Sequence, residues 1–181
     1  MISLILPTRA RPKRALEFLQ SAFDGAIEPE LVEVVLYIDS DDESYQNFVS
    51  PFKNTIIIIG ERQSMSSYNR ICGKKSSGQI LFFVNDDIIV ETPGWDEEVR
   101  LVHMNSGDKI YFCYPNDCYK KEKLGVFPII SRFMFDNFNV LPEIYKGSFI
   151  DTHLHEIFRF LKRLGYDRIT YKNEISFRHD H

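Results

Sequence analysis

The sequence has little cysteine, no long apolar run and no excess of positive charge, and each of these absences excludes a class of protein or site. Its 3 cysteines are an odd number without the close pairing of a zinc site, so we expect reduced, structural thiols. No apolar run approaches the roughly 20 residues that span a bilayer, and no signal-peptide pattern opens the chain. We therefore expect a soluble, cytoplasmic protein without a transmembrane segment. A formal net charge of -4 argues against a nucleic-acid partner, which usually requires a basic surface.

What the 181 residues do contain is an alternation of strand-like and helix-like segments. Short apolar segments typical of strands lie at 2–6, 34–38, 55–59, 79–84, 109–114 and 175–177. Segments with a helical apolar period follow Pro12, follow Ser64 or Ser66 as a cap, and lie at 95–105 and 152–164, where Gly165 ends the last one. The apolar segment 127–135 stays unassigned. The alternation predicts one α/β domain with a mainly parallel sheet.

Polar side chains follow three of the predicted strands where those strands end. Thr8 and Arg11 come after the first strand, Asp39 ends the second, and Asp86 and Asp87 end the fourth. The carboxyl ends of parallel strands meet at one edge of a sheet, and open α/β sheets bind their ligands there. We therefore expect these side chains to be neighbours.

The adjacent acids Asp86 and Asp87 close a strand that is apolar throughout. Two carboxylates at a buried strand end repel each other and lose hydration, which is costly unless a cation or hydrogen-bond donors offset it. A divalent ion shared with a pyrophosphate does so, and carboxylate with phosphate oxygens suits Mn²⁺ or Mg²⁺. The alternative is that the two acids simply open a turn.

Several of these segments together resemble a family 2-type glycosyltransferase with the GT-A fold. They are the opening Ser3–Pro12, the acidic end of the second strand, Met65–Arg70, and Asn85–Asp87, which stands where the family has its acidic DxD-type motif. The resemblance implies a Rossmann-like, mainly parallel sheet flanked by helices in a compact single domain over 1–181. It also implies a nucleotide-sugar-binding half at about 1–100 and an acceptor and catalytic half at about 101–181.

The resemblance assigns roles to side chains that would hold the nucleotide. Thr8 and Asp39 match positions that bind the nucleoside, where Asp39 accepts a hydrogen bond from uracil, and this favours a UDP-sugar donor. Arg11 and Arg70 lie where cations would meet the base or phosphates, although a solvated surface also suits them. Asn69 matches the asparagine of the helix that precedes the acidic strand.

The resemblance also implies a Mn²⁺ or Mg²⁺ site. Asp87 would bind the ion, and Asp86 would face ribose or sugar hydroxyls. A late histidine often completes such a site, and we favour His179 over His181, although both lie close enough to the chain end to be frayed.

An inverting transferase also needs a carboxylate base that accepts the proton of the acceptor hydroxyl. Asp151 and Glu156 are the candidates. In the resembling family the acid precedes a helix that ends in Gly-Tyr, which Gly165 and Tyr166 supply, but in a different register. We favour Asp151, predicted at the N-cap of the last helix, where an aspartate also needs no catalytic explanation.

The expected function is thus metal-dependent transfer of a sugar from a nucleotide-sugar to a glycan or other hydroxyl acceptor. One alternative is a sugar-phosphate nucleotidyltransferase, but the segment Pro7–Pro12 lacks the glycines of its usual phosphate loop. A second alternative is a non-catalytic module that binds nucleotide-sugars or glycans. Trp95 would either pack a sugar on its ring or anchor the helix that follows it.

Overall fold

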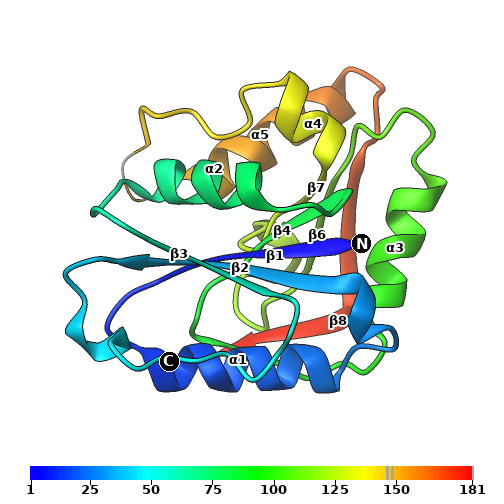
Figure 1. Cartoon of the computed structure of the whole chain (residues 1–181). Coiled ribbons are helices and arrows are strands. Elements are labelled where there is room, and N and C mark those ends of the chain that lie inside the picture. The colour runs from blue at the N-terminus through cyan, green and yellow to red at the C-terminus, as the bar shows by residue number, and fades with distance from the viewer. Residues whose placement is uncertain (146, 148, 181) are drawn as a thin grey trace.

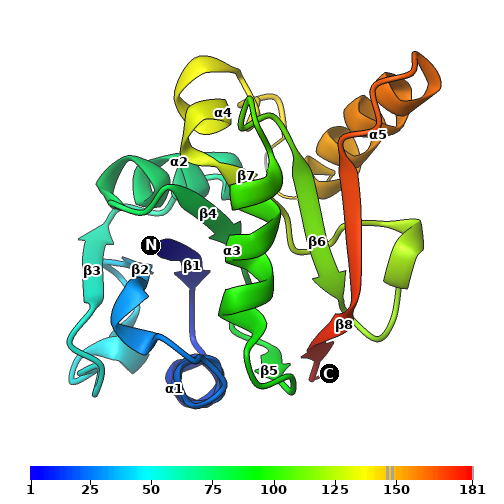
Figure 2. The same cartoon turned by 90° about the vertical axis from the view of Figure 1, so that its right-hand side faces the viewer.

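The computed structural model covers the whole chain and describes residues 1–145, 147 and 149–180. Its strands form one sheet in the order β3-β2-β1-β4-β7-β6-β8-β5. Helices lie on both faces of this sheet (Figures 1 and 2). The predicted α/β domain with a layered, Rossmann-like sheet is confirmed.

The first half of the sheet is parallel and contains the four strands predicted most directly from the sequence. These are β1 Ile2–Thr8, β2 Val32–Asp39, β3 Thr55–Gly60 and β4 Ile80–Phe83. β1 lies between β2 and β4, so that Leu4 is paired with Val34 on one side and with Phe82 on the other. Side chains buried on both faces explain why β1, β2 and β4 are nearly continuous apolar runs, whereas the edge strand β3 leaves Ile56, Ile57 and Ile59 exposed.

The second half of the sheet is mixed and was harder to predict. It contains β5 Ile88–Val90, β6 Phe112–Asn116, β7 Ile129–Ser131 and β8 Ile169–His179. β7 runs antiparallel to β4 and to β6, β8 runs parallel to β6, and β5 runs antiparallel to β8. The unassigned segment 127–135 supplies β7 and the short helix α4 Arg132–Asn137. β5 is only three residues long and is held by β8, so no local pattern indicated it.

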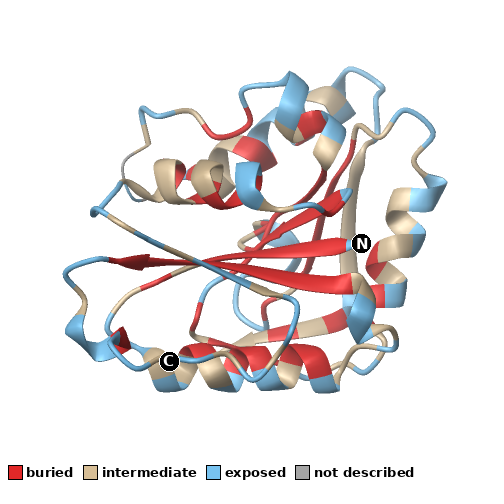
Figure 3. Ribbon diagram, in the orientation of Figure 1, coloured by how far each residue is buried: buried red, intermediate tan, exposed pale blue. Residues whose placement is uncertain are grey.

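Helices α1 Pro12–Asp24 and α3 Trp95–Asn105 pack on one face of the sheet, while α2 Met65–Lys75, α4 and α5 Ile150–Arg163 pack on the other. Each helix turns its buried residues toward the strands (Figure 3). Three short 3-10 turns, Pro29–Leu31, Glu43–Tyr45 and Lys121–Lys123, lie in the connections. No helix in the described part of the chain has the length and apolar character to cross a membrane.

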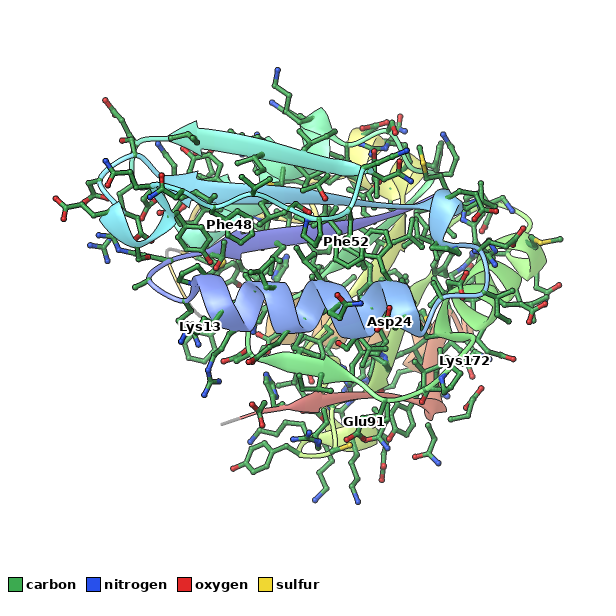
Figure 4. All side chains as sticks on the ribbon, turned by 60° about the horizontal axis from the view of Figure 1, so that its bottom comes forward. Lys13, Asp24, Phe48, Phe52, Glu91 and Lys172 are labelled. Atoms are coloured by element: carbon green, nitrogen blue, oxygen red, sulfur yellow. The ribbon has the colours of Figure 1, made fainter. Side chains whose placement is uncertain are left out.

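Trp95 is a core residue, and its predicted alternative role as a sugar platform is wrong. Its side chain is fully buried, and the indole Nε1 donates to the carbonyl oxygen of Ala22 at 2.9 Å. The rings of Phe82 and Phe177 pack edge-on against it. Elsewhere on this face an aromatic pair fills the space beside α1, where the ring of Phe52, labelled in Figure 4, stacks on that of Phe23 at 4.2 Å.

Near the predicted site, the start of α2 was predicted correctly from the sequence, whereas the start of α5 was not. Ser64 caps α2, because its Oγ accepts the Ser67 N–H at 3.2 Å. α5 begins at Ile150, two residues earlier than predicted, and therefore Asp151 lies inside its first turn and not at the N-cap. The backbone of Phe149, with φ 75°, precedes the helix there. The predicted end at Gly165, with φ 92°, is confirmed.

Candidate functional site

The carboxyl ends of β1 and β4 are joined by a buried hydrogen-bonded chain of side chains. Thr8 Oγ1 donates to Asp86 Oδ2 at 2.7 Å and lies 2.5 Å from the hydroxyl of Tyr45. Since the single hydroxyl hydrogen of Thr8 goes to Asp86, the Tyr45 hydroxyl must be the donor to Thr8. Burial raises the pKa of Asp86, while the Thr8 hydrogen bond and the charge of Arg11 oppose that rise. Burial likewise raises the pKa of Tyr45, to about 12, so that its hydroxyl keeps its proton.

Arg11 lies between the two acids that follow β4. One guanidinium nitrogen is 3.2 Å from Asp86 Oδ1, and the other is 3.2 Å from Asp87 Oδ2. The side chain of Arg11 is 49% exposed, whereas that of Asp86 is only 3% exposed. The repulsion that we expected a metal ion to offset is thus already offset by this guanidinium.

Asp87 has one oxygen that fits a metal ligand. Its Oδ1 atom is buried and has no hydrogen-bond partner among the described residues. No group of three or more His, Cys, Asp or Glu side chains in the described part of the chain is arranged to hold a metal ion by itself. Mg²⁺ and Mn²⁺ often take only one or two protein carboxylates, and substrate phosphates complete the shell. The residues present fit an ion that is bound together with its substrate.

His179 lies beside Asp87 through strand pairing. It is paired with Ile88 in the β5–β8 ladder, and the N–H of Asp180 donates to the carbonyl oxygen of Asp87 at 2.8 Å. The imidazole Nδ1 is 4.0 Å from a carboxylate oxygen of the buried Asp117. Arg14 of α1 holds the carbonyl oxygen of Asp180, which fixes this last segment against the first helix. The alternative ligand His181 lies outside the described residues.

Asp39 ends β2 in a second polar cluster. Arg9 donates to Asp39 Oδ2 at 2.5 Å, and the Tyr68 hydroxyl donates to Asp39 Oδ1 at 2.5 Å. Arg9 also bonds both oxygens of the exposed Asp41, at 2.7 and 3.2 Å. Burial, followed by the hydrogen bond to Asp39, raises the pKa of Tyr68. The cluster leaves Asp39 a buried acceptor whose charge is compensated.

Arg9, Tyr45 and Tyr68 were not predicted as site residues. Arg9 and Tyr68 are direct neighbours of predicted residues in the sequence, but adjacency does not say which side chain points toward the site. Tyr45 is in the turn that follows the acids of β2 and reaches Thr8 only in three dimensions. No sequence signal marks it.

A cleft of about 400 Å³ opens beside the acidic end of β4. It brings together three polar residues from separate elements: Asn69 of α2, Asn85 after β4, and Asp151 of α5. Asp151 uses one oxygen within its own helix turn, where Oδ1 accepts the N–H of Thr152 at 2.8 Å. The remaining lining is mainly apolar and comes from Met65, Phe83, Val84, Val126, Pro128, Leu141, Gly147, Phe149, Ile150 and Thr152.

Two predicted site residues, Glu156 and Arg70, lie neither in this cleft nor at the strand ends. Glu156 is exposed on α5 and forms an ion pair with Arg159 at 2.9 Å. Arg70 forms an ion pair with Glu143 at 2.5 Å and lines a different groove, next to α4. The structure therefore collects Thr8, Arg11, Asp39, Asp86 and Asp87 at the strand ends and Asn69 and Asp151 in the adjoining cleft.

Comparison with known proteins identifies the fold. No protein-family model and no curated protein matches the sequence. Among solved structures, S. aureus TarS has a TM-score of 0.71 at 14% identity over 99% of this chain and 36% of its own. The mannosyltransferase PcManGT from Pyrobaculum calidifontis, in complex with GDP-Man and Mn²⁺, has a TM-score of 0.71 at 12% identity over 99% of this chain and 56% of its own.

Glucosyl-3-phosphoglycerate synthase from Mycobacterium tuberculosis, in complex with Mn²⁺ and UDP-glucose, has a TM-score of 0.64 at 14% identity. That match covers 100% of this chain and 71% of the synthase. The chain thus spans only about a third of TarS and just over half of the mannosyltransferase. These relatives are GT-A-type glycosyltransferases, and the chain has the fold of that family, as its sequence predicted.

Proposed function

We propose that this protein is a metal-dependent glycosyltransferase that moves a sugar from a nucleotide-sugar, with a UDP-sugar favoured, to a hydroxyl acceptor with inversion. The observation that carries the proposal is the junction of the acidic end of β4 with a cleft that contains Asp151. One end of this junction suits a nucleoside diphosphate, and the other suits an acceptor and a base. Solved structures of the same fold hold UDP, UDP-GlcNAc, UDP-Glc or GDP-Man.

The nucleoside binds at the ends of β1 and β2. Asp39 accepts a hydrogen bond from the uracil ring, and its fixed orientation between Arg9 and Tyr68 prepares it for that role. A carboxylate oxygen has two lone pairs, so the bonds already present leave acceptor capacity for the base. Thr8 and Asp86 face the ribose or sugar hydroxyls, and Asn69 contributes its amide from α2.

Asp87 and His179 would hold Mn²⁺ or Mg²⁺, and the ion would supply Lewis-acid stabilisation of the departing diphosphate. Arg11 serves the same diphosphate as a side-chain cation. Its exposed guanidinium, which pairs with Asp86 and Asp87 in the structure, would pair with phosphate oxygens of the donor once Asp87 holds an ion.

Asp151 is the catalytic base in this proposal. The acceptor oxygen bonds to the anomeric carbon and gives its proton to Asp151, while the bond from that carbon to the phosphate oxygen breaks and its electron pair leaves with the nucleoside diphosphate. Asp151 faces the cleft next to Asn69 and Asn85, whose amides are suited to sugar hydroxyls. Glu156 is paired with Arg159 outside the cleft, which disfavours it as the base.

Release of nucleoside diphosphate tests the proposal. The protein is incubated with UDP- and GDP-sugars and Mn²⁺, and UDP or GDP is measured for the wild type, Asp87→Ala and Asp151→Asn. We expect release by the wild type, and its loss in both variants. A non-catalytic binding module releases nothing although nucleotide-sugars raise its Tm, and a nucleotidyltransferase releases pyrophosphate from a nucleoside triphosphate instead.

A further inference from the structure

Helix α5 has a second apolar face that the domain does not cover. Its inner face is buried against the sheet through Ile150, Leu154 and Phe158. On its outer face Ile157 is 41% exposed and Phe160 is 56% exposed, whereas the solvent-facing side of a surface helix usually carries charged or polar residues. The helix lies at the edge of the molecule, and its outer side faces away from the other elements (Figure 2). Such an apolar surface indicates a binding site.

This outer face forms a groove of about 580 Å³. Among the described residues that line it, Glu156 is the one acidic or basic side chain apart from His153, and it is neutralised by its ion pair with Arg159. Tyr145 forms one wall, and its hydroxyl lies 3.2 Å from His153 Nδ1. The described residues that line it are Tyr145, Phe149, Thr152, His153, Glu156, Ile157, Phe160 and Leu161.

The groove adjoins the cleft of the proposed active site. Phe149 and Thr152 line both hollows, and Asp151 lies between them at the start of α5. A ligand that lies along α5 in the groove therefore has one end next to the cleft that contains the proposed base. The polar end of such a ligand would meet Asp151, Asn69 and Asn85, while its other end would contact mainly apolar side chains.

We propose that the groove binds the apolar chain of the acceptor, so that the acceptor is an amphiphile with a hydroxyl-bearing head and an alkyl or polyprenyl-like tail. This inference rests on the proposed function, because it places the acceptor hydroxyl at Asp151. The volume lies in the range of about 300–1,000 Å³ that is typical of ligand sites. A second copy of the chain fits less well, since eight described residues line the groove and a stable interface takes roughly 20–30 residues on each side.

Binding of octyl glucoside below its critical micelle concentration tests the groove directly, with glucose as the chain-free comparison. Saturation-transfer NMR of the octyl methylenes is recorded with the wild type, Phe160→Gln, Ile157→Gln and the control Met104→Gln. Met104 is 70% exposed on α3, away from the groove, so its replacement matches the change in chemistry without changing the site. We expect the octyl chain to bind the wild type and the control, and binding to weaken about tenfold in each groove variant, because each removes apolar contact area.

Equal octyl signals in the wild type and the groove variants overturn the inference, and so does a signal from glucose as strong as that from the octyl chain. Sedimentation velocity is run on the same samples. A wild-type dimer that Phe160→Gln dissociates shows that a second copy fills the groove, and this result also overturns the inference.

Nucleotide-sugar binding is followed separately by thermal shift. A nucleotide-sugar shift without octyl binding refutes the groove alone, whereas octyl binding without any nucleotide-sugar shift refutes the proposed function and with it the acceptor role.

Discussion

The strand-end region and the α5 region of this protein are built in opposite ways. At the ends of β1, β2 and β4, buried polar groups are held by short hydrogen bonds and ion pairs, such as Thr8 to Asp86 and Tyr68 to Asp39. Along α5 the groove is open and its exposed surface is mainly apolar, although Thr152, His153 and Glu156 also line it. The polar groups of the strand-end region are held in fixed positions before a ligand binds. The α5 region instead presents apolar surface area and few hydrogen-bonding groups to a ligand. This difference suits a fixed nucleotide and an acceptor recognised mainly by its apolar part.

The largest expected effect is the loss of turnover when Asp151, which lies where the α5 region meets the cleft, is replaced. Replacing Asp151 by Asn removes the proposed base but keeps the size of the side chain, so turnover should fall by about 10²–10⁴ while nucleotide-sugar affinity stays unchanged. UDP release and thermal shift measure the two quantities on the same samples. Asp136→Asn, on the exposed surface of α4, is the matched control and should behave like the wild type. A variant with full turnover would remove Asp151 from the mechanism.

Replacing Arg11 tests the strand-end region, because it should change the affinities for Mn²⁺ and for UDP in opposite directions. With Arg11→Gln, Mn²⁺ should bind about tenfold more tightly in the absence of nucleotide, because no positive charge competes for Asp86 and Asp87, while UDP should bind about tenfold more weakly. Electron paramagnetic resonance of free Mn²⁺ and calorimetry with UDP give the two affinities. Lys13→Gln removes one charge from an exposed position on α1 and serves as the control. Weaker Mn²⁺ binding by the Arg11 variant would contradict the exchange of cations proposed here.

The buried carboxylate of Asp86 in the strand-end region should lower the stability of the folded protein at neutral pH. Burial raises its pKa, so the folded state retains the proton more strongly than the unfolded state, and the carboxylate lowers stability as the pH rises above 3.8, its ordinary value. Asp86→Asn should therefore raise Tm at pH 7 by about 2–4 °C, for about 1 kcal/mol, and the gain should vanish below the unfolded-state pKa. Thermal unfolding at pH 3 and pH 7 checks this, and a lower Tm at pH 7 would show that the ion pair with Arg11 outweighs burial.

The smallest effect belongs to Glu156. Since Glu156 is exposed and paired with Arg159, Glu156→Gln should change UDP release by less than about twofold and Tm by less than about 1 °C, as for an exposed ion pair. The same assay used for Asp151→Asn gives the comparison. A large loss of turnover in Glu156→Gln together with normal turnover in Asp151→Asn would reverse the roles assigned to these two acids.

Local sequence patterns were sufficient for the regular parts of the molecule. The buried strands β1, β2 and β4, the capping Ser64 and the glycine that ends α5 all depend on neighbours within a few positions, and they were predicted to within a few residues. The same holds for the meeting of Thr8 and Asp86, because parallel strands bring their carboxyl ends to one edge. Polarity at those ends pointed to the site.

Tertiary structure alone decided the contacts that join distant segments. β5 exists because β8 pairs with it, and Arg11 compensates two acids that are 75 and 76 positions away in the sequence. Whether Trp95 met solvent or the core depended on Phe82 and Phe177, which no periodicity connects to it.

The two candidate bases show the same division. Asp151 and Glu156 are five residues apart, which places them about 140° apart around a helix, so one cleft on α5 can accept only one of them. The sequence predicted Glu156 within the last helix and Asp151 at its N-cap, and the structure includes both acids in α5. The packing of its apolar inner face against the sheet then determined that Asp151 faces the cleft, because burial of Ile150, Leu154 and Phe158 fixes the rotation of the helix about its axis.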